Sequence, residues 1–94
     1  MRRINVDRLV SEIRKRNLQA TIELMSINDI AYIPALMKYI GDENEYVHAY
    51  LTLTLSSFPP DVILEALSKE LSSEDERRKN HAIEIINRCN TKKP

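Results

Sequence analysis

The side chains best suited to metal chemistry lie in one short stretch of this chain, IGDENEYVHAYL, from Ile40 to Leu51. Positions 42–45 carry three carboxylates and one amide, which are oxygen ligands of the kind that calcium prefers. A helix–loop–helix calcium site also requires a glycine at its sixth position and a bidentate glutamate at its twelfth. Counted from Asp42, those positions hold Val47 and Leu53. The spacing therefore favours a turn over a calcium loop.

In a turn, these acids have a structural role at the start of a helix. Asp42 is expected to cap the free backbone amides, and acidic side chains in a first turn complement the helix dipole. The stretch SSEDE, from Ser72 to Glu76, repeats this chemistry, with Ser73 in the place of the cap. A weak divalent-ion site is the alternative. We predict no metal and no cofactor.

Catalysis has few candidate residues. His81 and Cys89 lie eight positions apart on one expected helix, which separates them by about 12 Å along its axis, too far for a Cys/His pair. His48 and His81 could meet from different helices, but two histidines without a third ligand make a poor zinc site. Cys89 is expected to be a small core residue, and Gly41 stands alone, so no glycine-rich phosphate loop exists. We predict that the chain is not an enzyme.

The overall composition favours a single helical domain. The chain has 94 residues, of which 43% are hydrophobic, and it contains one glycine, one phenylalanine and no tryptophan. Such a mixture is rich in helix formers and poor in hairpin residues. A single cysteine, with neither a secretory nor a membrane-spanning pattern, leads us to expect a cytoplasmic protein that makes no membrane contact. We expect one domain over residues 1–94.

A repeat appears when the sequence is shifted by 31 residues, which places Asn28–Phe58 over Pro59–Cys89 without a gap. The two segments share five identical residues, and their apolar positions also coincide. They are therefore expected to bury the same helix faces. The identical pairs are Ala35/Ala66, Leu36/Leu67, Lys38/Lys69, Glu43/Glu74 and Glu45/Glu76, and the apolar pairs are Ile33/Leu64, Ile40/Leu71, Leu51/Ala82 and Leu55/Ile86.

A third, shorter copy precedes these two. In this copy, Leu9 and Ile13 take the places of Leu36 and Ile40. TIELMS at 21–26 resembles AIEIIN at 82–87, and the alignment requires that the turn of the first copy is about three residues shorter. The repeats then cover about 5–27, 28–58 and 59–89, followed by a tail at 90–94. Each repeat is expected to form two antiparallel helices, and the six helices are predicted at Val6–Arg16, Gln19–Ser26, Ile30–Ile40, Glu45–Ser57, Asp61–Leu71 and Asp75–Arg88.

Local signals fit most of these boundaries. Asp29 can cap the third helix and Gly41 suits its end, while Pro34 should either bend that helix or mark its true beginning. Pro60 falls at the first turn of the fifth helix, where it is tolerated. LTLTL at 51–55 alternates like a strand, but its equivalents in the other copies have helical patterns, so a helix is predicted there.

The run from Asn28 to Leu55 resembles a HEAT-like repeat, in which a Pro-Ala-Leu helix leads through an acidic turn into a Val-Arg-x-Ala helix. The matching residues are Pro34, Ala35, Leu36, Asp42 and Val47, whereas His48 stands where the family usually has arginine. The resemblance implies a short all-α solenoid of about three helix pairs and, by the habit of the family, a protein-binding role.

The fourth predicted helix carries the candidate binding residues. Its core stripe should be Val47, Leu51, Leu55 and Phe58, and beside it runs a second stripe with Tyr46, Tyr50 and Leu53. The repeat alignment places Glu23 and Glu84 where Leu53 stands, so Leu53 should face solvent or an interface. We therefore predict a non-catalytic interaction or scaffold module that binds a protein at Tyr46, Tyr50 and Leu53, with a homodimer as a second candidate. The alternative is that this stripe packs in the core.

Charge is unevenly distributed although the net charge is zero: residues 1–20 carry +4, 21–76 carry −9 and 77–94 carry +5. The basic turn of Arg14, Lys15 and Arg16 should adjoin an acidic turn with Glu43 and Glu45. That edge is expected to be either a ridge of weak ion pairs or a surface that steers a charged partner.

The alternative function is nucleic-acid binding through the basic N-terminal helix and the basic C-terminal segment. The zero net charge argues against it, because phosphate contacts supply most of the affinity of such proteins. The residues concerned are Arg2, Arg3, Arg8, Arg14, Lys15 and Arg16, together with Arg77, Arg78 and Lys79.

Overall fold

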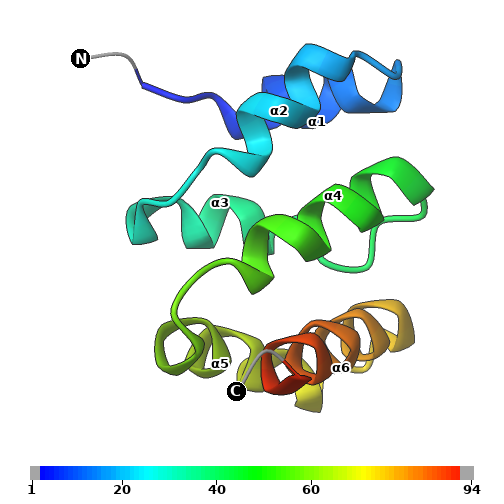
Figure 1. The fold of residues 1–94 in the computed structure, drawn as a ribbon. Coiled ribbons are helices and arrows are strands. Elements are labelled where there is room, and N and C mark those ends of the chain that lie inside the picture. Colours follow the sequence, from blue (N-terminus) through cyan, green and yellow to red (C-terminus); the bar gives the residue numbers. More distant parts are fainter. Residues whose placement is uncertain (1–2, 92–94) are drawn as a thin grey trace.

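Helices make up nearly all of the regular structure in residues 3–91, the part of the chain that the computed structural model describes, and those residues contain no strand (Figure 1). The predicted all-α class is therefore confirmed. LTLTL lies inside a helix. The elements are α1 (Val6–Arg14), α2 (Leu18–Met25), the 3₁₀ turn η1 (Ile30–Tyr32), α3 (Ile33–Met37), α4 (Glu45–Ser56), α5 (Pro60–Ser68), the 3₁₀ turn η2 (Lys69–Ser72) and α6 (Glu76–Thr91).

The helices form three pairs, each made of two helices joined by a turn, and the pairs are stacked on one another (Figure 1). The first helices of the pairs form one layer, because α1 packs against α3 and α3 against α5. The second helices form the other layer, in which α2 packs against α4 and α4 against α6. The α3/α4 pair therefore lies between the other two.

Short polar side chains start the second helices. Asn44 is the N-cap of α4, where its side chain accepts hydrogen bonds from the backbone amides of Tyr46 and Val47. Asp42, predicted to be the cap, instead accepts from the amide of Asn44 and so shapes the turn before the helix. The prediction of Asp42 as the cap is thus wrong by two residues, because the chain needs one more tight turn between Gly41 and α4.

The same arrangement recurs 31 residues later. Ser73 accepts from the amide of Asp75, and Asp75 accepts from the amides of Arg77 and Arg78 at the start of α6. The prediction of Ser73 as the cap is likewise wrong by two residues, because Asp75 accepts from the first amides of α6. Both helices begin at equivalent positions with the same set of hydrogen bonds.

The third predicted helix is shorter than expected. Residues Ile30–Tyr32 form a 3₁₀ turn capped by Asp29, and α3 begins at Ile33 with Pro34 in its first turn. Pro34 therefore marks the true beginning of the α-helix, which was one of its two predicted roles. Gly41 ends this segment with a φ of 81°, a conformation that favours glycine.

The first pair matches the second without a gap as far as Leu24. Asn17 and Asn44 are both N-caps, and the buried residues of α1 recur in the second pair 27 positions later. The difference in length lies at the end of the second helix, because α2 has 8 residues and α4 has 12. The predicted deletion in the turn is therefore wrong. The buried pairs are Val6/Ile33, Leu9/Leu36, Val10/Met37, Ile13/Ile40, Ala20/Val47 and Leu24/Leu51.

The third pair buries some but not all of the expected residues. Ala82 and Cys89 are fully buried like their equivalents Leu51 and Phe58, and Cys89 is a core residue as predicted. Leu71, in contrast, is 42% exposed although its equivalent Ile40 is only 3% exposed. The expectation that both halves bury the same faces is wrong at Leu71.

Candidate functional site

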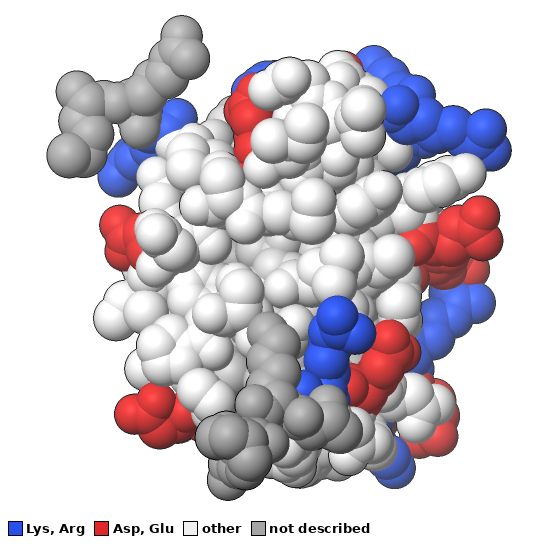
Figure 2. Space-filling view, in the orientation of Figure 1, with Lys and Arg blue, Asp and Glu red and all other residues white. Residues whose placement is uncertain are grey.

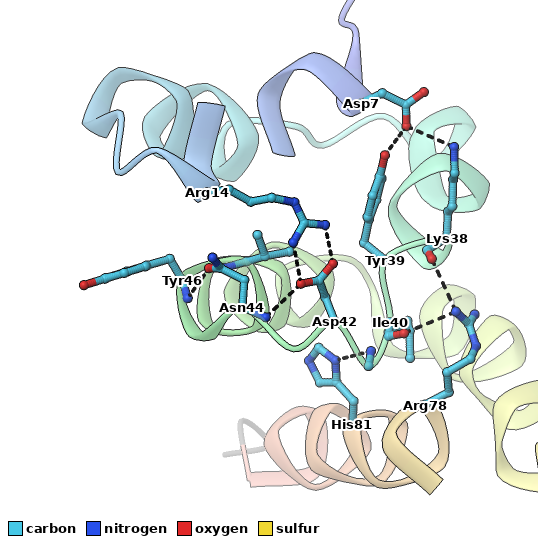
Figure 3. A network of polar contacts seen from close by, with 12 residues as sticks. Asp7, Arg14, Lys38, Tyr39, Ile40, Asp42, Asn44, Tyr46, Arg78 and His81 are labelled. Atoms are coloured by element: carbon cyan, nitrogen blue, oxygen red, sulfur yellow. Dashed lines mark hydrogen bonds and ion pairs between the residues drawn. The ribbon is translucent and has the colours of Figure 1, made fainter. Parts of the chain in front are cut away.

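The basic and acidic turns that the sequence placed side by side contact each other directly. The guanidinium of Arg14 donates two hydrogen bonds to the carboxylate of Asp42, the first with an N–O distance of 2.8 Å (Figure 3). Burial raises the pKa of Asp42, but the Arg14 guanidinium and the Asn44 amide outweigh burial and hold that pKa below its usual range. Arg77 in α6 lies 2.5 Å from the carboxylate of Glu43. Ion pairs thus join each turn to the next.

The other residues proposed for charge steering are more exposed. Lys15 lies 3.8 Å from Glu12 within its own helix turn, and Glu45 is exposed in the first turn of α4. The guanidinium carbon of Arg16 lies 5.1 Å from the centre of the Tyr46 ring, which is a cation–π distance. In Figure 2 blue and red side chains alternate along the right-hand edge, as a ridge of local ion pairs requires.

All four tyrosines of the chain belong to the middle pair, and all four face the first pair. The hydroxyl of Tyr32 accepts a hydrogen bond of 3.1 Å from the amide of Ile4, and the hydroxyl of Tyr39 donates to the carboxylate of Asp7 (Figure 3). Burial and this carboxylate raise the pKa of Tyr39 to about 12. The contact between the first and second pairs is therefore an aromatic one.

Tyr46 and Tyr50 lie at the seam between α2 and α4. They line a small, mainly apolar hollow of about 110 Å³ together with Ile13, Arg16, Leu18 and Thr21. Both rings are half-buried and pack on the core. These two tyrosines therefore combine the two roles left open by the sequence, since they pack between helices and also line a surface hollow.

The surface over α2 and α4 is apolar and open. Leu53 is 38% exposed, as the sequence suggested for this residue. On α2, Leu18, Ile22 and Met25 are 68%, 51% and 38% exposed at helical spacing. We call these four residues, with Tyr46 and Tyr50, the apolar face. In Figure 2, which has the orientation of Figure 1 with α2 and α4 toward the viewer, this region is white and the charged side chains lie around it.

The residues that α2 contributes to this face were not predicted from the sequence. The spacing of Leu18, Ile22 and Met25, which places them on one side of a helix, could have indicated this contribution.

A buried histidine joins the second and third pairs. The amide of Gly41 donates to Nδ1 of His81 at 2.9 Å, so the ring proton must be on Nε2. Nε2 then donates to the hydroxyl of Thr52 at 2.7 Å, and that hydroxyl donates to the carbonyl of His48. Burial, aided by the nearby His48, lowers the pKa of His81 to about 4. Both ring nitrogens are thus engaged, so His81 is not free to act as a base or a metal ligand.

His48 meets His81, as the sequence allowed, but through ring stacking. The ring centroids are 3.6 Å apart and the rings are nearly parallel, with an angle of 14°. Nε2 of His48 lies 2.9 Å from the carboxylate of Glu84. These rings border an open polar cavity of about 440 Å³, lined also by Gly41, Asp42, Glu43, Arg77 and Asn80. Among the described residues, no group of three or more His, Cys, Asp or Glu is arranged to hold a metal ion.

Arg78 closes the end of α3 with all of its guanidinium nitrogens. Nε and Nη2 donate to the carboxylate of Glu70 at 2.8 and 3.0 Å. Nη1 donates to the carbonyls of Lys38 and Ile40 in the turn after α3 (Figure 3). Nη2 donates to the carbonyl of Met37, the last residue of α3. The hydrogen bond from Arg78 lowers the pKa of Glu70. Arg78 therefore belongs to the junction between the second and third pairs.

No family model, curated protein or solved structure matches the chain. Within residues 3–91, none of the helices has the length and apolar character needed to cross a bilayer.

Proposed function

We propose that the chain is a non-catalytic, HEAT-like helical repeat module that binds a protein partner on the apolar face. The observation that carries this proposal is that two helices packed against each other, α2 and α4, expose Leu18, Ile22, Met25 and Leu53. Leu18 also lines the hollow at Tyr46 and Tyr50. Contiguous apolar patches on a folded surface are a common mark of protein–protein contact sites. The half-buried tyrosines offer rigid contact area with a polar tip.

The arrangement of the helices supports the repeat part of the proposal. Three helix pairs stack in chain order, as the pairs of an α-solenoid do. The residues that resemble a HEAT-like repeat include Pro34, Asp42 and Val47. In the structure they lie in the first turn of α3, shape the turn and start the core stripe of α4. The engagement of His81 on both ring nitrogens and the burial of Cys89 support a binding role over catalysis.

Nucleic-acid binding is less well supported, because most of the basic side chains already lie beside a carboxylate of the same molecule. Arg8, Arg14, Lys15, Arg77, Arg78 and Lys79 each lie within ion-pair distance of a carboxylate, and Arg16 lies over Tyr46. Arg3 is exposed, and Arg2 lies outside the described residues. Phosphate binding would have to break these pairs one by one. Binding to a generic duplex that is strong at low salt and collapses as salt is added would favour this alternative.

The test uses acidic substitutions on the apolar face. Leu53→Asp and Ile22→Asp should abolish capture of a protein partner from a native lysate, while leaving helicity by circular dichroism unchanged, because both side chains are at least 38% exposed. Ile30→Asp is the matched control, since Ile30 is 56% exposed but lies in η1, on the other layer. If the Leu53→Asp and Ile22→Asp variants still capture the partner, the proposed site is wrong. Loss of helicity in Leu53→Asp would show that Leu53 is core.

A further inference from the structure

The two ends of the stack differ in polarity. The positions to compare are those through which the middle pair contacts its neighbours. On its side toward α5 and α6, the middle pair buries Ile33, Ile40, Thr52 and Leu55, which are 7%, 3%, 6% and 0% exposed. Two of these residues contact the third pair: Ile33 borders the seam between α3 and α5, and the hydroxyl of Thr52 accepts from His81 in α6. A following helix pair is what covers these positions.

The equivalent positions of the third pair, 31 residues later, are all apolar but have no such cover among the described residues. Leu71 and Ile83 are 42% and 39% exposed, and Leu64 and Ile86 are half-buried. We call these four residues the C-terminal end face. It is formed by α5, η2 and α6, at the bottom of the stack in Figure 1.

The opposite end of the stack is polar. The residues through which the middle pair faces the first pair are its four tyrosines, and their equivalents 27 positions earlier lie on the outer side of α1 and α2. Those equivalents are Asn5, Glu12, Gln19 and Glu23. Terminal repeats with a polar outer face act as caps in repeat proteins. The first pair thus has the composition of a cap, and the third pair does not.

We propose that the C-terminal end face is the interface of a homodimer in which two copies of this chain associate tail to tail. A second copy is the occupant that fits, because the face is apolar and a twofold axis sets it against itself. A head-to-tail contact would set Leu71 and Ile83 against Glu12 and Glu23 of the next copy. It would remove these carboxylates and their ion-pair partners, Lys15 and Arg8, from water against an apolar surface, which is costly. The polar cap therefore favours a closed dimer over an open filament.

The side chains around the face are compatible with self-association. Along α6, the side that carries Ile83 and Ile86 continues into Lys79 and Asn90, at helical spacing. Lys79 has its own counter-charge, because its Nζ lies 3.5 Å from the carboxylate of Glu76. Repulsion between the two copies across the axis is therefore weak.

The experiment measures mass in solution by sedimentation equilibrium. The chain should approach about 22 kDa, twice its 10.9 kDa, as concentration rises. Leu71→Asp combined with Ile83→Asp should raise the dissociation constant at least about tenfold at unchanged helicity, since both side chains are already partly exposed. Ile22→Asp is the matched control and should leave the dimer intact. A 10.9 kDa species at every concentration would overturn the proposal.

The direction of association is tested with single introduced cysteines carrying spin labels, because Cys89 is only 1% exposed and does not compete for the label. Labels at Ser68→Cys in α5 should be close to each other across the dimer, whereas labels at Ser11→Cys in α1 should be far apart. Short distances between a Ser68 label and a Ser11 label in a mixed sample would show a head-to-tail contact and contradict the proposal.

The same variants separate this inference from the partner-binding proposal. If the dimer persists in Leu71→Asp with Ile83→Asp but is lost in Ile22→Asp, the apolar face is the dimer interface and the C-terminal end face is not. If Ile22→Asp loses the partner and keeps the dimer, the two surfaces act independently.

Discussion

The backbone amide of Gly41 donates a hydrogen bond to Nδ1 of His81, 40 residues further along the chain, with an N–N distance of 2.9 Å. This bond joins the turn of the middle pair to α6 and can exist only while His81 is neutral. The Thr52 hydroxyl fixes the remaining ring proton on Nε2. The junction between the second and third pairs therefore depends on the protonation state of one buried side chain.

The first prediction concerns pH. The pKa of His81 is about 4 in the folded chain, below its ordinary value of 6.5, so between these values the unfolded state binds a proton that the folded state does not. The free energy of unfolding should therefore fall as the pH is lowered from 6.5 toward 4, by on the order of 2 to 3 kcal/mol. Urea titrations at pH 7, 5.5 and 4.5 measure it.

His81→Gln provides the control for this effect, because glutamine does not titrate. The titratable groups that act on His81 are His48 and Asp42 on neighbouring elements and Glu84 on its own helix. The variant should be less stable at pH 7 but should lose less stability on acidification. An equal acid response in both proteins would show that His81 is not the source.

The second prediction concerns Gly41. A Cβ atom at this position would lie 2.7 Å from the backbone nitrogen of Arg78 and 2.9 Å from the carbonyl carbon of Arg77, and neither backbone atom can move aside cheaply. The positive φ adds a second cost for any other residue. Gly41→Ala should therefore destabilise the fold by about 2 to 4 kcal/mol, measured by chemical denaturation.

Gly41→Asn separates the two causes, because asparagine tolerates positive φ better than alanine but brings the same Cβ atom. We expect Gly41→Asn to be nearly as destabilising as Gly41→Ala. A fully stable Gly41→Asn variant would mean that backbone conformation, and not the approach of α6, explains the glycine.

The third prediction compares two adjacent arginines. Arg78→Lys keeps the charge, but a lysine cannot donate to Glu70 and to the three carbonyls of α3 and its turn at the same time. The substitution should lower the free energy of unfolding by about 2 to 4 kcal/mol. Arg77→Lys is the control, since the side chains of Arg77 and Glu43 are 63% and 74% exposed, and it should change stability by about 0.5 kcal/mol or less. Equal losses in thermal denaturation would contradict the capping role of Arg78.

Local residue preferences predicted the helices well. The helix-rich composition, the beginning of α3 at Pro34 and the positive φ of Gly41 follow from short-range rules, and the structure agrees with them. The caps lie two residues later than predicted, because Asp42 and Ser73 accept from the amides of Asn44 and Asp75 within the turns. Asn44 and Asp75 accept from the first amides of α4 and α6.

The candidate site was harder to predict because it depends on contacts between pairs. Leu53 was predicted to be exposed partly from an alignment with Glu23, yet in the structure Glu23 occupies the place of Tyr50, and only the match with Glu84 holds. Arg78 was grouped with a basic surface cluster, because nothing near it in the sequence indicates carbonyl partners about 40 residues away.

The placement of the tyrosines has an optical consequence. The chain has no tryptophan, so its ultraviolet fluorescence comes from four rings that all lie at the contact between the first and second pairs. Separation of α1 and α2 from the rest would change that emission strongly, whereas melting of α5 and α6 alone would leave it almost unaltered. Circular dichroism detects every helix, so a comparison of the two signals during unfolding would show which end of the stack opens first.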